Sequence, residues 1–369
     1  MTTTDIDQSK AEGLTQRTCN GLLEAMDLLT IYLGDRLGLY RALAEGGSAT
    51  PGELAERAGI HERYAREWLE QQAVTGILDV SDAAAASPER RYALSAGHAA
   101  TLADPMTPFP VVAFAQMMVA VAGAAPKLVE AYRTGGGVPW AGFGPDLIAG
   151  QGGFNRGWLL HELGTKYMPG IPDVHARLLA GPPARVADIA CGVGWSSIGI
   201  AKAYPRAQVV GYDLDAPSIE QARLNAEREG VADRVRFEVA DASQVRASGT
   251  FDVVVIIEAV HDVPRPVELL SGVRRLLAPG GAFIVADEKV ADSFSAPGDF
   301  MERLFYGASA LVCLPSGMAG QPSAATGAVM RRETMEAYAR QAGFTRVEVL
   351  PLDHPSMRFY RLYAASPAR

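Results

Sequence analysis

The stretch Val186–Ser197, which reads VADIACGVGWSS, constrains the fold more than any other part of the sequence. It is typical of a buried strand that breaks into a glycine turn and then opens a helix. Gly192 and Gly194 lack the Cβ atom that would keep a ligand away from the backbone. A second apolar segment ends at Asp213, whose carboxylate can accept hydrogen bonds from a ribose diol. The pattern predicts a nucleotide-type cofactor site.

The chemistry of this turn favours S-adenosylmethionine over a dinucleotide. A pyrophosphate-binding turn usually reads G-x-G-x-x-G, but Ser197 stands at the third glycine position. Asp188 adds a carboxylate inside the strand before the turn. S-adenosylmethionine has no phosphate but carries an ammonium and a sulfonium, so a carboxylate near its amino-acid end is useful. We therefore expect this cofactor, with S-adenosyl-L-homocysteine as its product.

Further segments typical of strands follow, of which Phe251–Ala259 is apolar enough for the centre of a sheet. They are Val235–Asp241, Phe251–Ala259, Ala282–Ala286, Arg346–Leu350 and Phe359–Tyr363. With these segments, residues 150–369 resemble the class I S-adenosylmethionine-dependent methyltransferases. The resemblance implies an α/β fold with a Rossmann-like, doubly wound, seven-stranded sheet that is mostly parallel, with its last strand antiparallel.

The same resemblance implies a set of cofactor-binding residues. Asp213 matches the ribose-binding acid, and Asp241 matches the acid that meets the adenine amino group. Ala190 departs from the family, which often has glycine there, and its methyl group should narrow the turn without abolishing binding. The expected cofactor-binding residues are Asp188, Gly192, Gly194, Asp213, Leu214, Asp241, Ala242 and Glu258.

His261, in the segment EAVHD just past the fourth strand, is the candidate general base. In plant-type O-methyltransferases, a histidine in a matching His-Asp pair is the base, and here Asp262 could orient its ring. Glu258 is either a loop acid without a ligand or a neighbour of the cofactor ammonium or the acceptor. Asp287 and Glu288 end the fifth strand on the same side. No local spacing motif indicates a metal, so none is expected.

The acceptor is expected to be a small molecule, because the segment before the sheet is rich in large apolar and aromatic side chains. This composition favours a hydrophobic or aromatic acceptor. The insertion after the fifth strand, Glu302–Arg331, is placed to cover it. That insertion and the ending Arg358–Leu362 resemble a large group of actinobacterial winged-helix methyltransferases, whose acceptors are mostly unassigned. The expected acceptor-binding residues are Phe114, Met117, Trp158, His161 and Met318.

Residues 1–105 resemble a winged-helix module. Thr50 and Pro51 signal a helix start, and Ile77–Val80 could pair with Arg91–Leu94 as a small wing. Between Pro51 and Val80 there are six acidic and three basic residues, a net charge of −3, which opposes binding to nucleic acid phosphates. Similar modules dimerise O-methyltransferases, so a homodimer is expected.

Length and composition agree with a multidomain enzyme. We expect a winged-helix domain at 1–105, a helical linker at 106–175 that contributes to the acceptor pocket, and a cofactor-binding domain at 176–369. The net charge of −8 argues against an anionic membrane or nucleic acid as a partner. The three cysteines form no disulfide framework, the polar N-terminus is not a secretory signal, and the apolar run Val111–Ala125 falls short of a membrane span. A cytoplasmic location follows.

Alternatives to O-methylation remain open at this stage. The same fold could serve C- or N-methylation, with or without a metal, or a non-methylating reaction on a natural product. A third class is a regulator that binds a small molecule through the C-terminal domain and DNA through the winged helix. The acidic winged helix argues against this third class.

Overall fold

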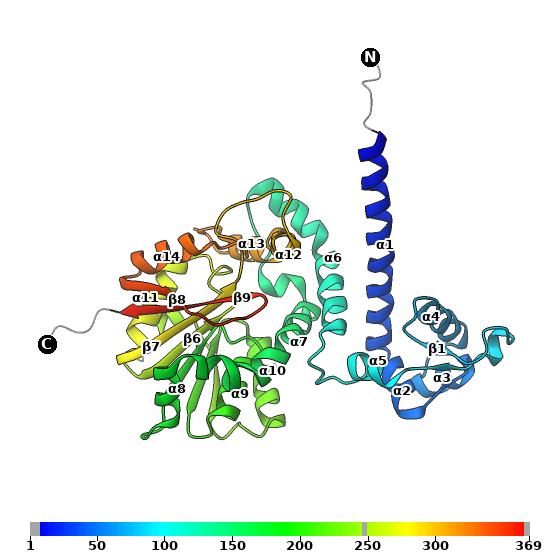
Figure 1. Ribbon diagram of the computed structural model, residues 1–369, viewed down its shortest axis with the longest axis horizontal. Helices are drawn as coiled ribbons and strands as arrows, with labels where there is room; N and C mark the ends of the chain where they lie inside the picture. The colour runs from blue at the N-terminus through cyan, green and yellow to red at the C-terminus, as the bar shows by residue number, and fades with distance from the viewer. Residues whose placement is uncertain (1–7, 246–248, 365–369) are drawn as a thin grey trace, which may run out of the picture. The chain divides into compact units, whose positions relative to one another are not determined.

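The computed structural model describes residues 8–245 and 249–364, which form two compact units (Figure 1). The first unit extends to Val119 and also contains Ala149–Phe154. The second contains Ala120–Ile148 and everything from Asn155 onward. The division into residues 1–105, 106–175 and 176–369 stays a prediction.

The first unit has the helices and the wing of a winged-helix module. β1 and β2 pair antiparallel, with Val80 opposite Tyr92, which confirms the predicted wing. Tyr40 and Leu69 lie in its buried core, where the Tyr40 hydroxyl donates to Gln72 Oε1 at 2.6 Å. The elements of this unit are α1 (Gln8–Arg36), α2 (Leu39–Gly46), α3 (Pro51–Ala58), α4 (Glu62–Val74), β1 (Asp79–Val80), η1 (Ser87–Glu89), β2 (Tyr92–Ala93) and α5 (Ala96–Leu102).

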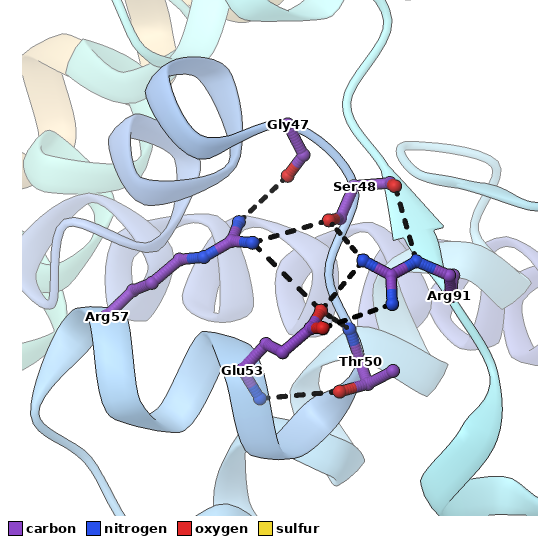
Figure 2. A network of polar contacts seen from close by, with 6 residues as sticks. All are labelled: Gly47, Ser48, Thr50, Glu53, Arg57 and Arg91. Carbon is purple, nitrogen blue, oxygen red and sulfur yellow. Dashed lines mark hydrogen bonds and ion pairs between the residues drawn. The ribbon is translucent and has the colours of Figure 1, made fainter.

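A polar network ties α3 to the wing (Figure 2). Thr50 caps α3 as predicted: its hydroxyl accepts from the Glu53 backbone N–H, and Glu53 Oε2 accepts from the Thr50 N–H. Arg91, beside β2, donates to both oxygens of Glu53 and to the Ser48 carbonyl. Arg57 contacts the same carbonyl and Gly47. The network holds the start of α3 against the wing without presenting a free basic surface.

The second unit is built on a seven-stranded sheet in the order β5-β4-β3-β6-β7-β9-β8. The strands β5, β4, β3, β6 and β7 pair in parallel, and β9 is antiparallel to both β7 and β8. This is the doubly wound sheet that the sequence predicts, with the last strand antiparallel. The strands are β3 (Arg185–Ile189), β4 (Gln208–Asp213), β5 (Val235–Val239), β6 (Phe251–Ile257), β7 (Leu277–Glu288), β8 (Phe344–Val349) and β9 (Met357–Ala364).

Helices cover both faces of this sheet (Figure 1). α9 (Trp195–Ala203) and α10 (Ala216–Arg228) connect strands that step outward from β3, whereas α11 (Pro266–Leu276) connects strands that step the other way. Right-handed crossovers in opposite directions put these helices on opposite faces. The order of the strands therefore reverses between β3 and β6, and ligands of such sheets bind at the carboxyl ends beside this reversal. α8 (Pro172–Leu179) and α14 (Arg332–Gln341) complete the layers.

The segment before the sheet is helical. α6 (Val111–Thr134) continues beyond the predicted apolar run, because Pro126 and the charged residues that follow remain within the helix. It is the one helix in the described residues that is long and apolar enough to cross a membrane, a criterion that core helices also meet. The other elements here are η2 (Trp140–Phe143), α7 (Pro145–His161), η3 (Leu163–Tyr167) and η4 (Met168–Gly170).

The predicted insertion after β7 folds as a helical cover. α12 (Phe300–Ala308) begins at Asp299, whose side chain accepts from the Glu302 N–H. It continues through η6 (Ser309–Cys313) into α13 (Leu314–Met318). The cover packs on the loop that follows β6: the Gly327 N–H donates to the His261 carbonyl at 3.1 Å, and the Ala324 N–H donates to the Pro264 carbonyl. The insertion therefore lies over the end of β6.

Candidate cofactor and catalytic site

The glycine turn after β3 has three residues with positive φ: Ala190, Gly192 and Gly194, at 55°, 51° and 85°. Ala190 occupies a left-handed conformation where glycine is usual, at a cost of about 1 kcal/mol. A Cβ atom on Gly192 would meet no protein atom within 4 Å, so open space lies in front of that residue. A Cβ on Gly194 would lie 2.6 Å from the Phe237 ring. Gly194 is therefore needed for packing, and only Gly192 leaves room for a ligand.

Asp188 lies behind this turn. Its Oδ2 accepts hydrogen bonds from the hydroxyls of Ser196 and Ser197, at 2.5 and 2.6 Å. Burial raises the pKa of Asp188 to about 6, against the opposing effect of the two serine hydroxyls. The side chain thus fixes the start of α9 to β3, and its role at the amino-acid end of a cofactor stays a prediction.

Asp213 ends β4 and holds the turn from the other side. Its Oδ2 accepts from the Gly192 N–H at 2.8 Å and its Oδ1 from the Asp215 N–H at 2.9 Å. Burial raises its pKa. Leu214 beside it is 71% exposed, an unusual exposure for a leucine in the sheet domain. A carboxylate with two oxygens has acceptor sites to spare, so Asp213 can bind hydroxyls while it holds Gly192.

Asp241 follows the neighbouring strand β5. It caps the short helix η5 (Ala242–Gln244), accepting from the Ser243 N–H at 2.9 Å and from the Gln244 side chain at 3.0 Å. Ala242 is buried. The Ala240 N–H donates to the Asp213 carbonyl, so the ends of β4 and β5 lie side by side. The structure therefore brings together the residues predicted for the ribose and the adenine.

Glu258 stands directly after β6, with a φ of 51°, and its N–H donates to the Ala286 carbonyl of β7. The side-chain amide of Asn155, on α7, donates to Glu258 Oε2. Burial raises the pKa of Glu258 to about 7, and the hydrogen bond from Asn155 opposes that rise. β3 and β6 are neighbours, with Ile189 opposite Ile256, so Glu258 ends the strand next to the glycine turn.

His261 is enclosed by three acids. Its Nδ1 lies 2.6 Å from Asp287 Oδ1 and 2.8 Å from Glu288 Oε2, and its Nε2 lies 3.2 Å from Asp262 Oδ1. His261 is only 2% exposed. The predicted orienting acid, Asp262, therefore faces the other ring nitrogen, because β7 delivers Asp287 to Nδ1. Asp262 contacts Nε2, the atom from which a base would act.

The charges of this cluster are strongly coupled. Burial alone would lower the pKa of His261, but Asp262, Glu288 and Asp287 hold it well above its ordinary value. Burial raises the pKa of Glu288 well above its usual range. Against the effect of burial, His261 holds the pKa of Asp287 below its usual value. Of these two adjacent acids, Asp287 is therefore the one that ionises more readily beside the imidazole.

Cys313 reaches the same cluster from the helical cover. Its Sγ and the ligand atoms of His261 and Asp262 all lie within 4.8 Å of one another, as do those of His261, Asp287 and Glu288. Either group could hold a metal by distance. The 2.6 Å contact between His261 and Asp287 is, however, the length of a strong hydrogen bond. We assign the contact between His261 Nδ1 and Asp287 Oδ1 to hydrogen bonding, and the absence of a metal stays a prediction.

The predicted acceptor residues are divided between the two units. Trp158, His161 and Met318 belong to the second, where Trp158 is partly buried, His161 is exposed and Met318 ends α13. Phe114 and Met117 belong to the first, where the Phe114 ring lies 5.7 Å from that of Phe154. All five stay predictions as acceptor contacts.

Sequence reasoning missed Asn155 and Cys313. Asn155 lies 103 residues before its partner Glu258, and no local motif marks it. Cys313 stands in an insertion whose packing on His261 depends on the fold. Asn155 lies between Gln151 and Arg156 on α7, so its polar side chain is no local signal either.

The sheet order, the glycine turn and the acid after β4 define a Rossmann-like methyltransferase fold. Residues 182–326 match the family described as a methyltransferase domain, and residues 25–111 match an Rv2258c-like winged HTH domain. The chain therefore carries a winged helix-turn-helix domain, followed in the sequence by a methyltransferase domain of the S-adenosylmethionine-dependent class. This confirms the resemblance inferred from the motifs.

Known proteins agree with this assignment. The chain is similar to a ubiquinone biosynthesis O-methyltransferase of Burkholderia pseudomallei (strain 1710b), with 35% identity over 122 residues, 33% of this chain and 50% of that protein. The chain spans half or less of the length of such curated relatives. The structure of the mitomycin 7-O-methyltransferase MmcR is similar in fold (TM-score 0.64, 21% identity, 97% of this chain and 100% of that one). The structure of human N-acetylserotonin methyltransferase in complex with SAM is also similar in fold. Its TM-score is 0.66 and its identity 15%, over 99% of this chain and 100% of that one.

Proposed function

We propose that the protein transfers a methyl group from S-adenosylmethionine to an oxygen of a small, hydrophobic or aromatic acceptor, with His261 as the general base. The observation that carries the proposal is the buried imidazole of His261, held at Nδ1 by Asp287 beside the end of β6. This is the edge of the sheet at which the glycine turn and Asp213 also lie.

The residues present fit the cofactor. Open space lies in front of Gly192, Asp213 keeps acceptor capacity for ribose hydroxyls, and Leu214 exposes an apolar side chain that suits adenine. Asp241 and Ala242 would stand at the far end of the adenine, and Glu258 at the ammonium. When bound, the cofactor supplies an electrophilic methyl group on its sulfonium.

The protein's own contribution is positioning and proton removal. His261 accepts the acceptor's hydroxyl proton at Nε2, and Asp287 stabilises the resulting imidazolium through Nδ1. Asp262, next to Nε2, would accept a hydrogen bond from the Nε2–H that this transfer creates. The helical cover contacts the His261 carbonyl through the Gly327 N–H. From this position it would exclude water from the reacting atoms.

The pH dependence of methyl transfer tests His261 as base. The imidazole must be unprotonated to accept a proton, and its pKa is held well above the ordinary value. The rate with radiolabelled S-adenosylmethionine and a panel of phenols should therefore rise with pH until well above 6.5. Asp287→Asn removes a negative charge from Nδ1, lowers the pKa of His261 and should move this rise to lower pH.

Asp292→Asn is the matched control, because Asp292 contacts Arg358 at 3.3 Å and is 70% exposed. It should leave the pH profile of the wild type unchanged. An identical profile in wild type and Asp287→Asn, with full folding of both, would overturn the role of His261. A wild-type protein that does not bind S-adenosylhomocysteine would overturn the whole proposal.

N-methylation is the second candidate, and the acidity of the site favours it. Three acids, Asp262, Asp287 and Glu288, enclose a single imidazole, and Glu258 is near enough for His261 to lower its pKa. An excess of buried carboxyl groups suits an amine more than a phenol. The same panel extended to amines distinguishes the two. C-methylation, a metal-assisted reaction and a non-methylating reaction have no observation of their own, and a DNA-binding regulator is disfavoured by the acidic winged helix.

We also propose that the protein is a homodimer formed through its first unit. One side of α1 exposes a stripe of large apolar residues at helical spacing, opposite the buried Ile31. These residues are Leu22, Met26, Leu29 and Leu33. A second copy of the same stripe would cover it with matching chemistry. We also propose a cytoplasmic location, which the three free cysteines support because they suit a reducing compartment. A place in secondary metabolism is proposed from the resemblance to small-molecule O-methyltransferases.

Leu29→Glu should convert this dimer to a monomer, because it places a charge at the centre of the stripe. Light scattering coupled to size-exclusion chromatography measures the mass directly. Glu24→Gln changes an exposed residue of the same helix outside the stripe and should keep the dimer. A wild-type monomer at micromolar concentration, or a Leu29→Glu dimer, would contradict the proposal.

A further inference from the structure

Three side chains form a hydrogen-bonded chain that ends at the candidate site. The indole N–H of Trp158 donates to Asn155 Oδ1 at 3.1 Å, and the Asn155 amide donates in turn to Glu258 Oε2. Asn155 and Trp158 are three residues apart on α7 and so share one face of the helix. Asn155 is only 7% exposed. An amide this deeply buried must satisfy its polar atoms within the protein.

Trp158 fixes the orientation of Asn155. An indole nitrogen can only donate, and a carboxylate can only accept. The asparagine oxygen must therefore face Trp158, and its NH₂ group must face Glu258. The reverse orientation would set N–H against N–H at one end and oxygen against oxygen at the other. The hydrogen-bond network alone thus determines how the amide is turned.

Trp158 is itself held by an aromatic cluster. Its ring centroid lies 4.8 Å from that of His354, 6.1 Å from Tyr167 and 6.4 Å from Phe359. His354 Nδ1 accepts from the N–H groups of Ser356 and Met357, so its ring is fixed as well. Burial lowers the pKa of His354 to about 4, which keeps it neutral. The cluster is a rigid support rather than a titrating group.

We propose that Asn155, oriented by Trp158, is the positioning residue that holds Glu258 toward the ammonium of the methyl donor. The inference rests on the proposed function. Asp188 has both serine hydroxyls on one oxygen and is 1% exposed, whereas Glu258 ends the strand next to the turn. Asn155 donates to the ionised carboxyl and so favours the charge that an ammonium needs. Glu258 also has a left-handed backbone, which gives it a defined direction.

The test compares two ligands that differ at the amino-acid end. S-adenosylhomocysteine carries the ammonium, and 5′-methylthioadenosine lacks it. Asn155→Ala should weaken binding of S-adenosylhomocysteine by about 10- to 100-fold, the range for a hydrogen bond to a charged group, and leave methylthioadenosine unchanged. Calorimetry measures both affinities. A purely structural role would weaken the two ligands equally.

Trp158→Phe keeps a ring in the cluster but removes the N–H, and it should weaken S-adenosylhomocysteine in the same selective way. The double variant should bind no more weakly than Asn155→Ala alone, because both changes act through Glu258. Tyr167→Phe is the control: it removes a hydroxyl of the same cluster that donates to Glu162 and should change neither affinity.

The outcomes separate this inference from the proposed function. A wild-type protein that binds neither ligand overturns both. A wild type that binds S-adenosylhomocysteine, with Asn155→Ala equal to it, overturns the role of Asn155 and leaves the proposed function standing. The positioning role is also overturned if Asn155→Ala weakens the binding of both ligands equally. The same holds if the losses of affinity from the two single changes add up in the double variant.

Discussion

Asp213→Ala should weaken binding of S-adenosylhomocysteine by about 10²-fold or more. The carboxylate would accept hydrogen bonds from two ribose hydroxyls, each worth about 1.5–3 kcal/mol when the acceptor is charged. It also holds the Gly192 N–H at 2.8 Å, so its loss frees the turn on which the cofactor would lie. Asp213→Asn should bind S-adenosylhomocysteine nearly as weakly as Asp213→Ala, because one of the two acceptor oxygens is replaced by an NH₂ group, which donates. Calorimetry with the purified variants measures the change.

Asp233→Asn is the matched control for this experiment. Asp233 lies before β5, is 73% exposed and forms an ion pair with the neighbouring Arg234 at 2.8 Å. It should bind S-adenosylhomocysteine as the wild type does. If Asp213→Ala remains folded and binds as tightly as Asp233→Asn, the nucleoside does not lie on this turn.

The sequence predicted the sheet well because its strands are separated by clear local signals. Phe251–Ala259 illustrates this as an apolar run bounded by turns, and the observed β6 differs from it only at its end, whereas β5 alternates apolar and charged residues. The acids at the strand ends were predictable for the same reason: a parallel sheet brings its carboxyl ends to one edge. Asp213 and Asp241 are therefore where the motifs put them.

The partners of the site residues were less predictable. The His-Asp pair predicts that Asp262 orients the His261 ring, but Asp287 reaches Nδ1 from β7, 26 residues away. Which ring nitrogen meets which acid depends on χ angles and on the pairing of β6 with β7. A sequence motif contains neither. The role of Gly194 was also hidden, since only the position of Phe237 shows that a Cβ there would clash.

His261→Gln should reduce methyl transfer by about 10²-fold or more and leave the affinity for S-adenosylhomocysteine unchanged. Glutamine can still donate to Asp287, so the buried acid keeps a partner, but its amide cannot accept a proton at neutral pH. His261→Ala should lose at least as much activity and also stability, because Asp287 and Glu288 would remain buried with no imidazole between them. Thermal unfolding separates the two effects.

The control for His261→Gln is His98→Gln, on the exposed surface of α5, a histidine with no predicted role in the site. It should retain the activity and the melting temperature of the wild type. A folded His261→Gln that binds the product and transfers methyl groups at the wild-type rate would remove the base from the mechanism. Catalysis would then depend on positioning alone, which suffices for an acceptor that reaches the site already ionised, since an in-line sulfonium needs no other activation.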